Sequence, residues 1–428
     1  MENTNEKVID MLLKTLRMVC EENGLNYVFA VEAKNKPDSA LWYSVPVDTD
    51  LEEAKQMIAD GKDVVSLGAG EPDFPTPTPI QDAACKAIRE GKTRYTAPVG
   101  ILEVRKAVAE KLKKENGLDY KPEQIIMTSG AKHAVFNSLA ALINEGDEVI
   151  IPAPYWVTYP ELVKWLGGKP VIVSTKIEDG FKIKPEALKA AITAKTKAIL
   201  LNNPCNPTGA VYSKAEIEAL SKVIVESDIY CISDEVYEYF TYDTEFCSAA
   251  ALPGMAERTI VINGFSKSHC MTGWRIGYDA APAEIAKIIG KIQGQATHHP
   301  SNVAQYAALG ALQMDKSNVH AMQAAFRKRR DYMLKRTAEI LPEPCRAPEG
   351  AFYLFAPVKS FYGKKTPEGK VIGGSIELCE YLLQSQGLAI VPGAAFGDDS
   401  CVRFSYAASD ETLQKACDRF IKGLKDLR

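Results

Sequence analysis

The chain has 428 residues, of which 46% are hydrophobic and 25% are charged, and its formal net charge is −4. A chain of this length can form two or three domains and bury a large core. The charge balance leaves no basic surface for nucleic acid, and no apolar run approaches the ~20 residues that cross a bilayer.

The cysteines and the N-terminus indicate where the protein works. The ten cysteines are scattered with no CxxC pair, which is typical of reduced thiols. The opening MENTNEKVID is acidic and polar, unlike a secretory signal. We therefore predict a cytoplasmic protein with no nucleic-acid or membrane partner. The adjacent His298 and His299 are interpreted as structural, because neighbours in sequence rarely converge on one metal, and no metal site is predicted.

Residues 1–47 are predicted to form a separate α-β-β extension. An apolar stripe in VIDMLLKTLRMVCEENG predicts a helix that ends at Gly24. The segments NYVFAVEA and ALWYSVPV flank the turn KNKPDS and predict a β-hairpin. A unit of this size buries little surface alone, so we expect it to pack on the main body or on a partner chain.

From about residue 124, β-branched runs alternate with amphipathic helices. Strands are predicted in QIIMTSG, DEVIIPAP, KPVIVST, KAILLNNP, IYCISDE and TIVINGFS. This alternation predicts a mainly parallel sheet with helices on both faces. Ligands of such sheets bind beyond the carboxyl ends of the strands. Polar clusters follow four of these strands, at Ser129-Gly130, Asn202 to Gly209, Asp234-Glu235 and Gly264 to Lys267.

A second, smaller α+β unit follows. A long helical stretch, SNVAQYAALGALQ through AFRKRRDYMLKRTAEIL, leaves the sheet. The segments GAFYLFAPV, LAIVPGAAFG and CVRFSYA then predict strands, and SDETLQKACDRFIKGLKDL predicts a closing helix. The basic run RKRR at 327–330 lies between apolar positions of the long helix. We interpret it as a solvated helix face rather than a nucleic-acid patch.

The polar clusters together supply the groups that one cofactor needs. Pyridoxal phosphate requires a lysine, an acid at the pyridine nitrogen, donors to the phenolic oxygen, a stacked aromatic ring and a phosphate cup. The chain offers a candidate for each in SLGAGEPDF, RYTAPVG, SGAKHAVFN, PAPYWVTYP, NNPCNPTG, SDEVY, GFSKSHCMTGWRIG and CVRFSYAAS. In this order and spacing, the eight segments resemble the class I aminotransferases of the aspartate aminotransferase family, from about residue 54 to the C-terminus.

This resemblance implies an α/β fold, that of the pyridoxal-phosphate-dependent transferases of fold type I. A large domain contains a mainly parallel seven-stranded sheet, and a smaller domain is α+β. We accordingly divide the chain into the extension 1–47, a small domain of residues 48–80 plus 318–428, and a large cofactor-binding domain of residues 81–317.

The resemblance also implies roles for the residues around the cofactor ring. Lys267 is expected to be the Schiff-base lysine, whose released amine acts as general base at the substrate Cα. Asp234 is expected to keep the pyridine nitrogen protonated. Asn206 and Tyr237 are expected to donate hydrogen bonds to the phenolic oxygen. Trp156 is expected to stack on the ring.

A second implied group binds the cofactor phosphate. Arg275 is expected to form a bidentate pair with it, and Ser266 to supply a hydroxyl. The backbone amides around Ala131 and Lys132 open a helix, whose N-terminus favours an anion. In the family, the phosphate-binding tyrosine that Tyr95 matches comes from the neighbouring subunit, so a homodimer is expected. Gly264 stands where some members of the family carry a phosphate-binding serine.

The remaining implied residues contact the substrate. Arg403 is expected to clamp the α-carboxylate, with the backbone of Gly70 opposite it and Trp156 and Asn206 beside it. Lys132 matches a lysine with which bacterial-type relatives attract a second carboxylate. The segment that shapes the pocket from the N-terminus in the family is not recognisable before residue 48.

We therefore expect a ping-pong aminotransferase that moves an amino group between aspartate, or a similar dicarboxylic amino acid, and 2-oxoglutarate. Prephenate as acceptor is an alternative, and so is another reaction on the same scaffold, such as β-elimination or ring closure. A third alternative is a transcription regulator with an aminotransferase-like sensor domain. It needs a basic DNA-binding module, whereas residues 1–50 carry nine acids and five bases.

Overall fold

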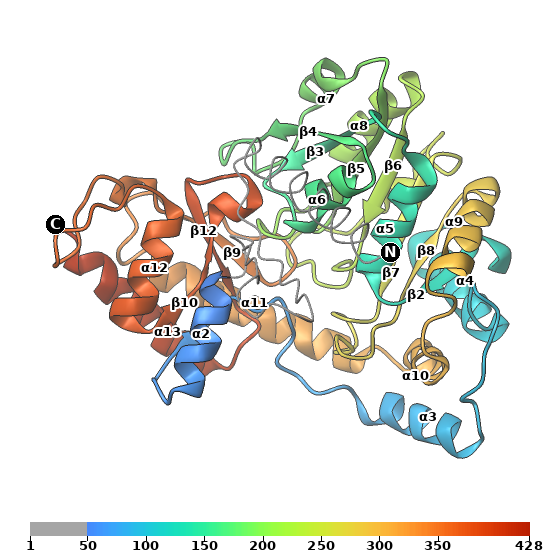
Figure 1. Ribbon diagram of the computed structural model, residues 1–428, viewed down its shortest axis with the longest axis horizontal. Helices are drawn as coiled ribbons and strands as arrows, with labels where there is room; N and C mark the ends of the chain where they lie inside the picture. Colours follow the sequence, from blue (N-terminus) through green and yellow to red (C-terminus); the bar gives the residue numbers. More distant parts are fainter. Residues whose placement is uncertain (1–48) are drawn as a thin grey trace, which may run out of the picture.

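The computed structural model of the chain describes residues 49–428, and the extension predicted at residues 1–47 lies outside the described residues. A large body surrounds a seven-stranded sheet, and a smaller body lies beside it at the C-terminal end of the chain (Figure 1). The exact division of the chain between two domains stays a prediction.

The large sheet has the strand order β2-β8-β7-β6-β5-β3-β4. Its strands are β2 (Ile125–Thr128), β3 (Glu148–Ala153), β4 (Lys169–Ser174), β5 (Thr196–Asn202), β6 (Tyr230–Asp234), β7 (Thr259–Gly264) and β8 (Gly277–Ala280). The neighbouring strands β7, β6, β5, β3 and β4 run parallel to one another. Strand β8 runs antiparallel to both of its neighbours, β2 and β7. All six predicted strands are confirmed. The short segment GYDA of β8 was not predicted, because it carries too few apolar residues to show a strand pattern.

Helices cover both faces of this sheet. On one face, α5 (Ala131–Leu142), α6 (Thr158–Trp165) and α9 (Ala283–Ala296) pack against apolar side chains of the central strands. On the other face, α7 (Pro185–Ala191) and α8 (Lys214–Glu226) cover one end of the sheet, and α4 (Leu102–Asn116) and α10 (Asn302–Gln313) cover the other end. Helix α3 (Thr78–Arg89) packs against α10. Strands such as β2 and β7 are buried along their whole length, which explains why their apolar side chains pack on both faces of the sheet.

The smaller body contains a three-stranded antiparallel sheet of order β11-β12-β9. Its strands are β9 (Tyr353–Pro357), β11 (Val391–Pro392) and β12 (Cys401–Ser405). A separate parallel pair joins β1 (Val65–Ser66) to β10 (Leu388–Ala389). Helices α2 (Thr49–Ala59), α11 (Ser317–Thr337), α12 (Ser375–Gln386) and α13 (Asp410–Asp426) lie around these strands (Figure 1). The predicted strand in LAIVPGAAFG therefore divides into two short strands in different sheets.

The described residues also form four short 3₁₀ helices: η1 (Pro122–Gln124), η2 (Ala249–Ala251), η3 (Lys359–Phe361) and η4 (Gly393–Phe396). The long helical stretch of the sequence is two helices, because α10 ends at Gln313 and α11 begins at Ser317. The carboxylate of Asp315 accepts a hydrogen bond from the amide of Ser317 at 2.8 Å at this break.

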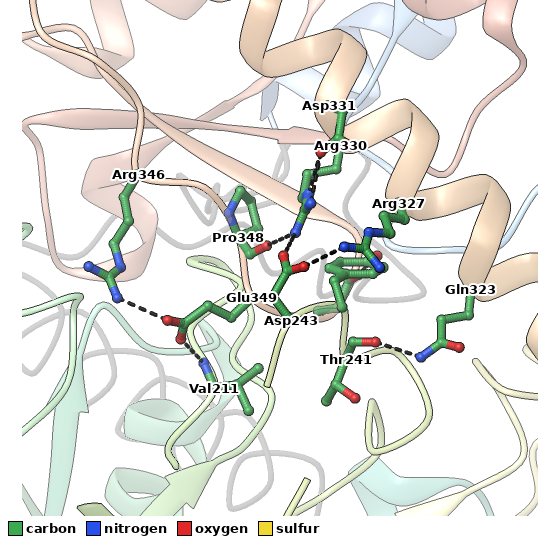
Figure 2. A network of polar contacts seen from close by, with 12 residues as sticks. Val211, Thr241, Asp243, Gln323, Arg327, Arg330, Asp331, Arg346, Pro348 and Glu349 are labelled. Carbon is green, nitrogen blue, oxygen red and sulfur yellow. Dashed lines mark hydrogen bonds and ion pairs between the residues drawn. The ribbon is translucent and has the colours of Figure 1, made fainter. Parts of the chain in front are cut away.

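The interpretation of RKRR as a solvated face is wrong for half of the run. Arg327 and Lys328 are 53% and 76% exposed in their side chains, but Arg329 and Arg330 are only 10% and 7% exposed. Figure 2 shows Arg330 reaching the carboxylate of Asp243 at 2.6 Å and the carbonyl of Pro348 at 3.0 Å. The buried arginines are stable there because carboxylates from distant loops pair with them.

Within residues 49–428, no helix is apolar over enough length to span a bilayer, and no cluster of histidine, cysteine and carboxylate side chains is arranged to hold a metal ion. Nine of the ten cysteines fall in this part of the chain, and all nine are free thiols.

Candidate active site

A cavity of about 330 Å³ opens where the carboxyl ends of the parallel strands face the smaller body. The large body contributes residues that follow β2, β3, β5, β6 and β7, and the smaller body contributes residues of β9, β11, η4 and β12. The lining residues are Gly70, Ala131, Lys132, Trp156, Val157, Tyr159, Asn202, Asn206, Asp234, Val236, Tyr237, Ser266, Lys267, Arg275, Tyr353, Val391, Phe396 and Arg403.

Eleven of the twelve site residues predicted from the sequence line this one cavity. Tyr95 is the exception. Its side chain is 91% exposed, and its ring centroid lies 5.8 Å from those of both His298 and His299. Tyr95 therefore lies outside the cavity of its own chain, and its role at a neighbouring subunit stays a prediction. The structural role of the two histidines also stays a prediction.

Lys267 follows β7 and points toward the segment that precedes α3. Its Nζ donates a hydrogen bond to the carbonyl of Gly70. Burial lowers the pKa of Lys267 to about 8, with Glu71 acting in the opposite direction and the positive charge of Arg275 adding to the lowering. At this pKa of about 8, about a tenth of the Lys267 amines are neutral at pH 7, whereas an ordinary lysine is almost fully charged. Lys267 is thus suited to act as a nucleophile and as a base near neutral pH.

Asp234 is the last residue of β6 and is almost fully buried. Burial raises the pKa of its carboxyl to about 6, although hydrogen bonds from Tyr159 and Val236 and the charge of Lys267 oppose the rise. The hydroxyl of Tyr159 donates to Oδ2 at 2.7 Å, and the amide of Val236 donates to Oδ1 at 3.3 Å. Asp234 is therefore mostly ionised at neutral pH and can hold a positive charge in the cavity.

The hydroxyls of Tyr237 and Tyr353 lie 2.7 Å apart and share a hydrogen bond. Both side chains are buried, and burial raises the pKa of each phenol. Each tyrosine therefore keeps its proton and can donate it in a hydrogen bond. The two come from different bodies, since Tyr237 follows β6 and Tyr353 begins β9.

Arg403 lies on β12 with only 7% of its surface exposed. Its Nη1 donates to Oδ1 of Asn206 at 2.9 Å, and its Nη2 donates to the carbonyl of Gly68 at 2.6 Å. Nε has no partner within the described part of the chain. The rings of Tyr353 and Phe396 flank the guanidinium at 4.7 and 4.8 Å. Burial lowers the pKa of this arginine, and an anion in the cavity would compensate for that cost.

A further anion site lies at the start of α5. Gly130 precedes this helix with φ 86°, and a Cβ on it would come within 2.6 Å of Nη2 of Arg275. Arg275 donates to the carbonyl of Thr272 at 3.0 Å, and Ser266 is buried beside the same cavity. An arginine, a hydroxyl and the amides of a helix N-terminus together favour an anion such as phosphate.

The glycine at 264 has a structural reason. A Cβ there would come within 3.2 Å of Cα of Gly277 on the neighbouring strand β8. The close contact of β7 and β8 thus leaves little room for the serine that some members of the family carry.

Comparisons with known proteins place the chain in a family. The sequence pattern of aminotransferase class I and II matches residues 62–420. The chain belongs to this family. An aspartate/prephenate aminotransferase of Cereibacter sphaeroides is 45% identical over 370 residues, covering 86% of this chain and 92% of that protein. An aspartate aminotransferase of Bacillus subtilis is 45% identical over 369 residues, covering 86% of this chain and 93% of that protein.

Solved structures of aminotransferases also match this aminotransferase. The aspartate aminotransferase of Rhizobium meliloti has a TM-score of 0.86 at 39% identity, covering 92% of this chain and 100% of that chain. The aspartate aminotransferase of Thermus thermophilus with maleate has a TM-score of 0.82 at 41% identity, covering 87% of this chain and 95% of that chain. These likenesses confirm the predicted fold type I and the dependence of the family on pyridoxal phosphate.

The residues of the cavity fit this cofactor. The anion site at α5 suits its phosphate, Lys267 suits its aldehyde, and the buried carboxylate of Asp234 suits a protonated ring nitrogen. When bound, pyridoxal phosphate supplies an aldehyde for amino groups and a conjugated ring that takes up the electrons released at the substrate Cα. Lys267 carries a proton on Nζ, and Tyr159 keeps the carboxylate of Asp234 oriented and ionised.

Sequence reasoning assigned no role to seven residues of the cavity, of which three have aromatic side chains. Tyr159 and Tyr353 stand in the quoted segments PAPYWVTYP and GAFYLFAPV, but their spacing does not show which residues they contact. Phe396 lies on η4, in a segment predicted only as part of a strand. All three act through contacts that chain folding creates, with Asp234, Tyr237 and Arg403 respectively.

Proposed function

We propose that this enzyme transfers the amino group between aspartate, or a similar dicarboxylic amino acid, and 2-oxoglutarate by a ping-pong reaction. The observation that carries the proposal is that Arg403 and Lys132 line the same cavity as Lys267. Two cations suit a substrate with two carboxylates. The names of the relatives support this, and so does the maleate, a dicarboxylate, bound to the Thermus thermophilus enzyme.

Each substrate contact has a proposed role. Arg403 clamps the α-carboxylate, with its unpaired Nε available and Asn206 and Gly70 beside it. Lys132, whose Nζ lies 5.0 Å from the ring centroid of Trp156, attracts the second carboxylate. Trp156 itself forms one wall of the pocket.

The cofactor contacts are proposed as follows. Lys267 forms the covalent bond, and Asp234 pairs with the ring nitrogen. Asn206 and Tyr237 donate to the phenolic oxygen, and Trp156 stacks on the ring. The phosphate is held by Arg275, Ser266 and the amides at Ala131 and Lys132, at the anion site of α5.

Prephenate is a second candidate acceptor. The relatives from Cereibacter sphaeroides and Petunia hybrida both have prephenate in their names. Prephenate also carries two carboxylates, so the same two cations suit it. Activity with prephenate and glutamate or aspartate, measured beside activity with 2-oxoglutarate, decides whether this enzyme accepts it.

We also propose that the enzyme is a cytoplasmic homodimer in which Tyr95 reaches the phosphate site of the partner. The exposure of 91% of this aromatic side chain supports a covering partner. In a mixture of a Tyr95→Phe variant and a Lys267→Ala variant, hybrid dimers should contain one site with both residues intact. Recovered activity supports the exchange, and an active monomer in light scattering contradicts it.

The central experiment separates cofactor attachment from amino transfer. Borohydride reduction followed by peptide mapping should place the cofactor on Lys267, and adding aspartate alone should convert the visible absorbance band of the bound cofactor. A label on another lysine contradicts the assigned site. A spectrum that aspartate leaves unchanged contradicts the proposed substrate.

A further inference from the structure

One segment of the cavity wall contacts two cations of the site, Arg403 and Lys267, through its backbone. The carbonyl of Gly68 accepts from Nη2 of Arg403 at 2.6 Å, and the carbonyl of Gly70 accepts from Nζ of Lys267. We name residues 68–76 the Gly68–Thr76 strip. Its position decides where the two carbonyls lie, and so how Arg403 and Lys267 are oriented.

The strip has no regular secondary structure to hold it in place. Among the described residues, none of its backbone groups forms a hydrogen bond with another backbone group. Its side chains hold it instead. Thr272 donates to Glu71 at 2.8 Å, and Thr76 donates to the carbonyl of Cys270 at 2.6 Å, both from the loop that carries Lys267. A further polar anchor is Asp73, which is held by the smaller body.

Arg329 of α11 holds Asp73 in a two-pronged ion pair. Nη1 lies 2.7 Å from Oδ1 and Nη2 lies 2.8 Å from Oδ2. The rings of Phe74 and Phe326 lie 5.4 and 5.7 Å from the guanidinium carbon. Parallel hydrogen bonds of this kind fix angle as well as distance, which a single ammonium contact does not do.

The arginine is itself fixed to rigid elements. Its side chain is only 10% exposed, and its Nε donates to Oδ1 of Asp410 at 3.3 Å, at the first turn of α13. The centre of the strip is thereby tied to two helices of the smaller body, whereas its ends are tied to Arg403 of β12 and to the loop that carries Lys267.

We propose that Arg329 is a positioning residue of the active site. Through Asp73 it holds the Gly68–Thr76 strip so that the carbonyls of Gly68 and Gly70 stay on Arg403 and Lys267. The part of this proposal that concerns substrate binding rests on the proposed function, but the part that concerns Lys267 does not.

The same basic run provides matched controls. Lys328 pairs with Asp410 at 2.9 Å, and Arg327 pairs with Asp243 at 2.6 Å (Figure 2). Neither side chain has a hydrogen bond or ion pair with the strip among the described residues. Changes at Lys328 and Arg327 therefore remove a neighbouring charge and leave the anchor of the strip in place.

The test compares Asp73→Asn and Arg329→Lys with the controls Lys328→Met and Arg327→Met. The first readout is trace acetylation of Lys267 by acetic anhydride in the cofactor-free protein, followed by peptide mass mapping. Loss of the carbonyl contact at Gly70 frees the amine and disfavours its charged form, so we expect about tenfold faster labelling in Asp73→Asn and Arg329→Lys. The two controls should label at the wild-type rate.

The second readout is the Kd of maleate for the protein loaded with the cofactor, measured by calorimetry. This Kd should rise by about tenfold in Asp73→Asn and Arg329→Lys, because Arg403 loses its orientation and binds maleate more weakly. The double variant should be no weaker than the single variants, because the pair acts as one unit. Melting temperatures in all variants show whether folding is retained, and Asp73, with a side chain that is 26% exposed, tolerates substitution even where Arg329 does not.

Labelling of Lys267 at the wild-type rate in Asp73→Asn, or equal acceleration in Lys328→Met, overturns the proposal. Failure of the wild-type enzyme to use aspartate contradicts the proposed function and leaves the labelling result as the test of Arg329, since that measurement needs neither cofactor nor substrate.

Discussion

The hydroxyl of Tyr159 donates a hydrogen bond of 2.7 Å to Oδ2 of Asp234 in a part of the cavity where both side chains are buried. The donor lies on α6 and the acceptor ends β6, so the packing of this helix on the sheet aims the carboxylate. The hydrogen bond counteracts the burial that raises the pKa of Asp234 to about 6. Tyr159 therefore lowers the pH at which this carboxylate becomes protonated.

Tyr159→Phe should move the acid limb of the pH profile of kcat/KM to higher pH. Without the donor, the ionised form of Asp234 loses stabilisation and its pKa rises further, by about one unit for a hydrogen bond to a charged group. As the pH is lowered, the variant therefore loses activity at a higher pH than the wild type does. Tyr155→Phe is the control, because Tyr155 lies nearby on the same segment and, within the described part of the chain, makes no hydrogen bond to the Asp234 carboxylate. An unchanged acid limb in Tyr159→Phe would show that another group sets it.

Gly70→Ala should damage the site by a clash with one named atom. A Cβ on Gly70 would come within 2.6 Å of the hydroxyl oxygen of Tyr353, while the nearest ring carbon lies at 3.6 Å. Because that hydroxyl is fixed by Tyr237, either the tyrosine or the strip must move. Crowding of this kind costs about 1–3 kcal/mol, which we expect to see in the free energy of unfolding together with lower kcat/KM.

The clash gives a direct rescue. Tyr353→Phe removes the oxygen and leaves the ring, so the double variant Gly70→Ala with Tyr353→Phe should recover most of the lost stability. Tyr353→Phe alone is the reference for the cost of losing the hydrogen bond to Tyr237. If the double variant is as unstable as the sum of its parts, the clash lies elsewhere.

Glu235→Gln should make stability less dependent on pH. Burial raises the pKa of Glu235 from 4.5 to about 8. Ser233 and Ser248 donate to its Oε1, and Oε2 has no partner in the described part of the chain. Between these two pKa values the folded protein binds more protons than the unfolded chain, so stability falls as pH rises, by at most about 1.4 kcal/mol per pH unit.

Glutamine does not titrate, so this fall should be absent from the variant between about pH 5 and 8. Urea unfolding of both proteins at intervals across this range measures it. Glu226→Gln, at an exposed position of α8, is the control for loss of one charge. Parallel curves for wild type and Glu235→Gln would mean that Glu235 is already ionised in the folded state.

How much of the site could be predicted from the sequence depends on how far apart in the sequence the contacting residues lie. The strand ends that carry Asp234, Asn206 and Lys267 were predicted to lie together because parallel strands end at one edge of a sheet. The contact of Asp73 with Arg329 joins residues 256 positions apart, between a loop and a helix, and no local pattern specifies it. For the same reason the RKRR run was interpreted as solvated.

Substrate choice gives the last prediction. Arg403 is proposed to bind a carboxylate that every amino acid has, so Arg403→Lys should lower kcat/KM for all substrates alike. Lys132 is proposed to bind only a second carboxylate. A charge-assisted hydrogen bond contributes about 1.5–3 kcal/mol, which corresponds to a factor of about ten to a hundred. Lys132→Ala should therefore lower kcat/KM for aspartate and glutamate by this factor and spare alanine and phenylalanine.

Steady-state kinetics with these four amino acids separate the possible roles of the lysine. Equal losses for acidic and neutral substrates would show that the Lys132 side chain only supports the anion site at the start of α5. The backbone amide of residue 132 remains in the alanine variant, so that site should keep its helix N-terminus and its phosphate. Full activity of Lys132→Ala on aspartate would assign the second carboxylate to another group. Removal of residues 1–47 would then test the segment that the family resemblance does not explain.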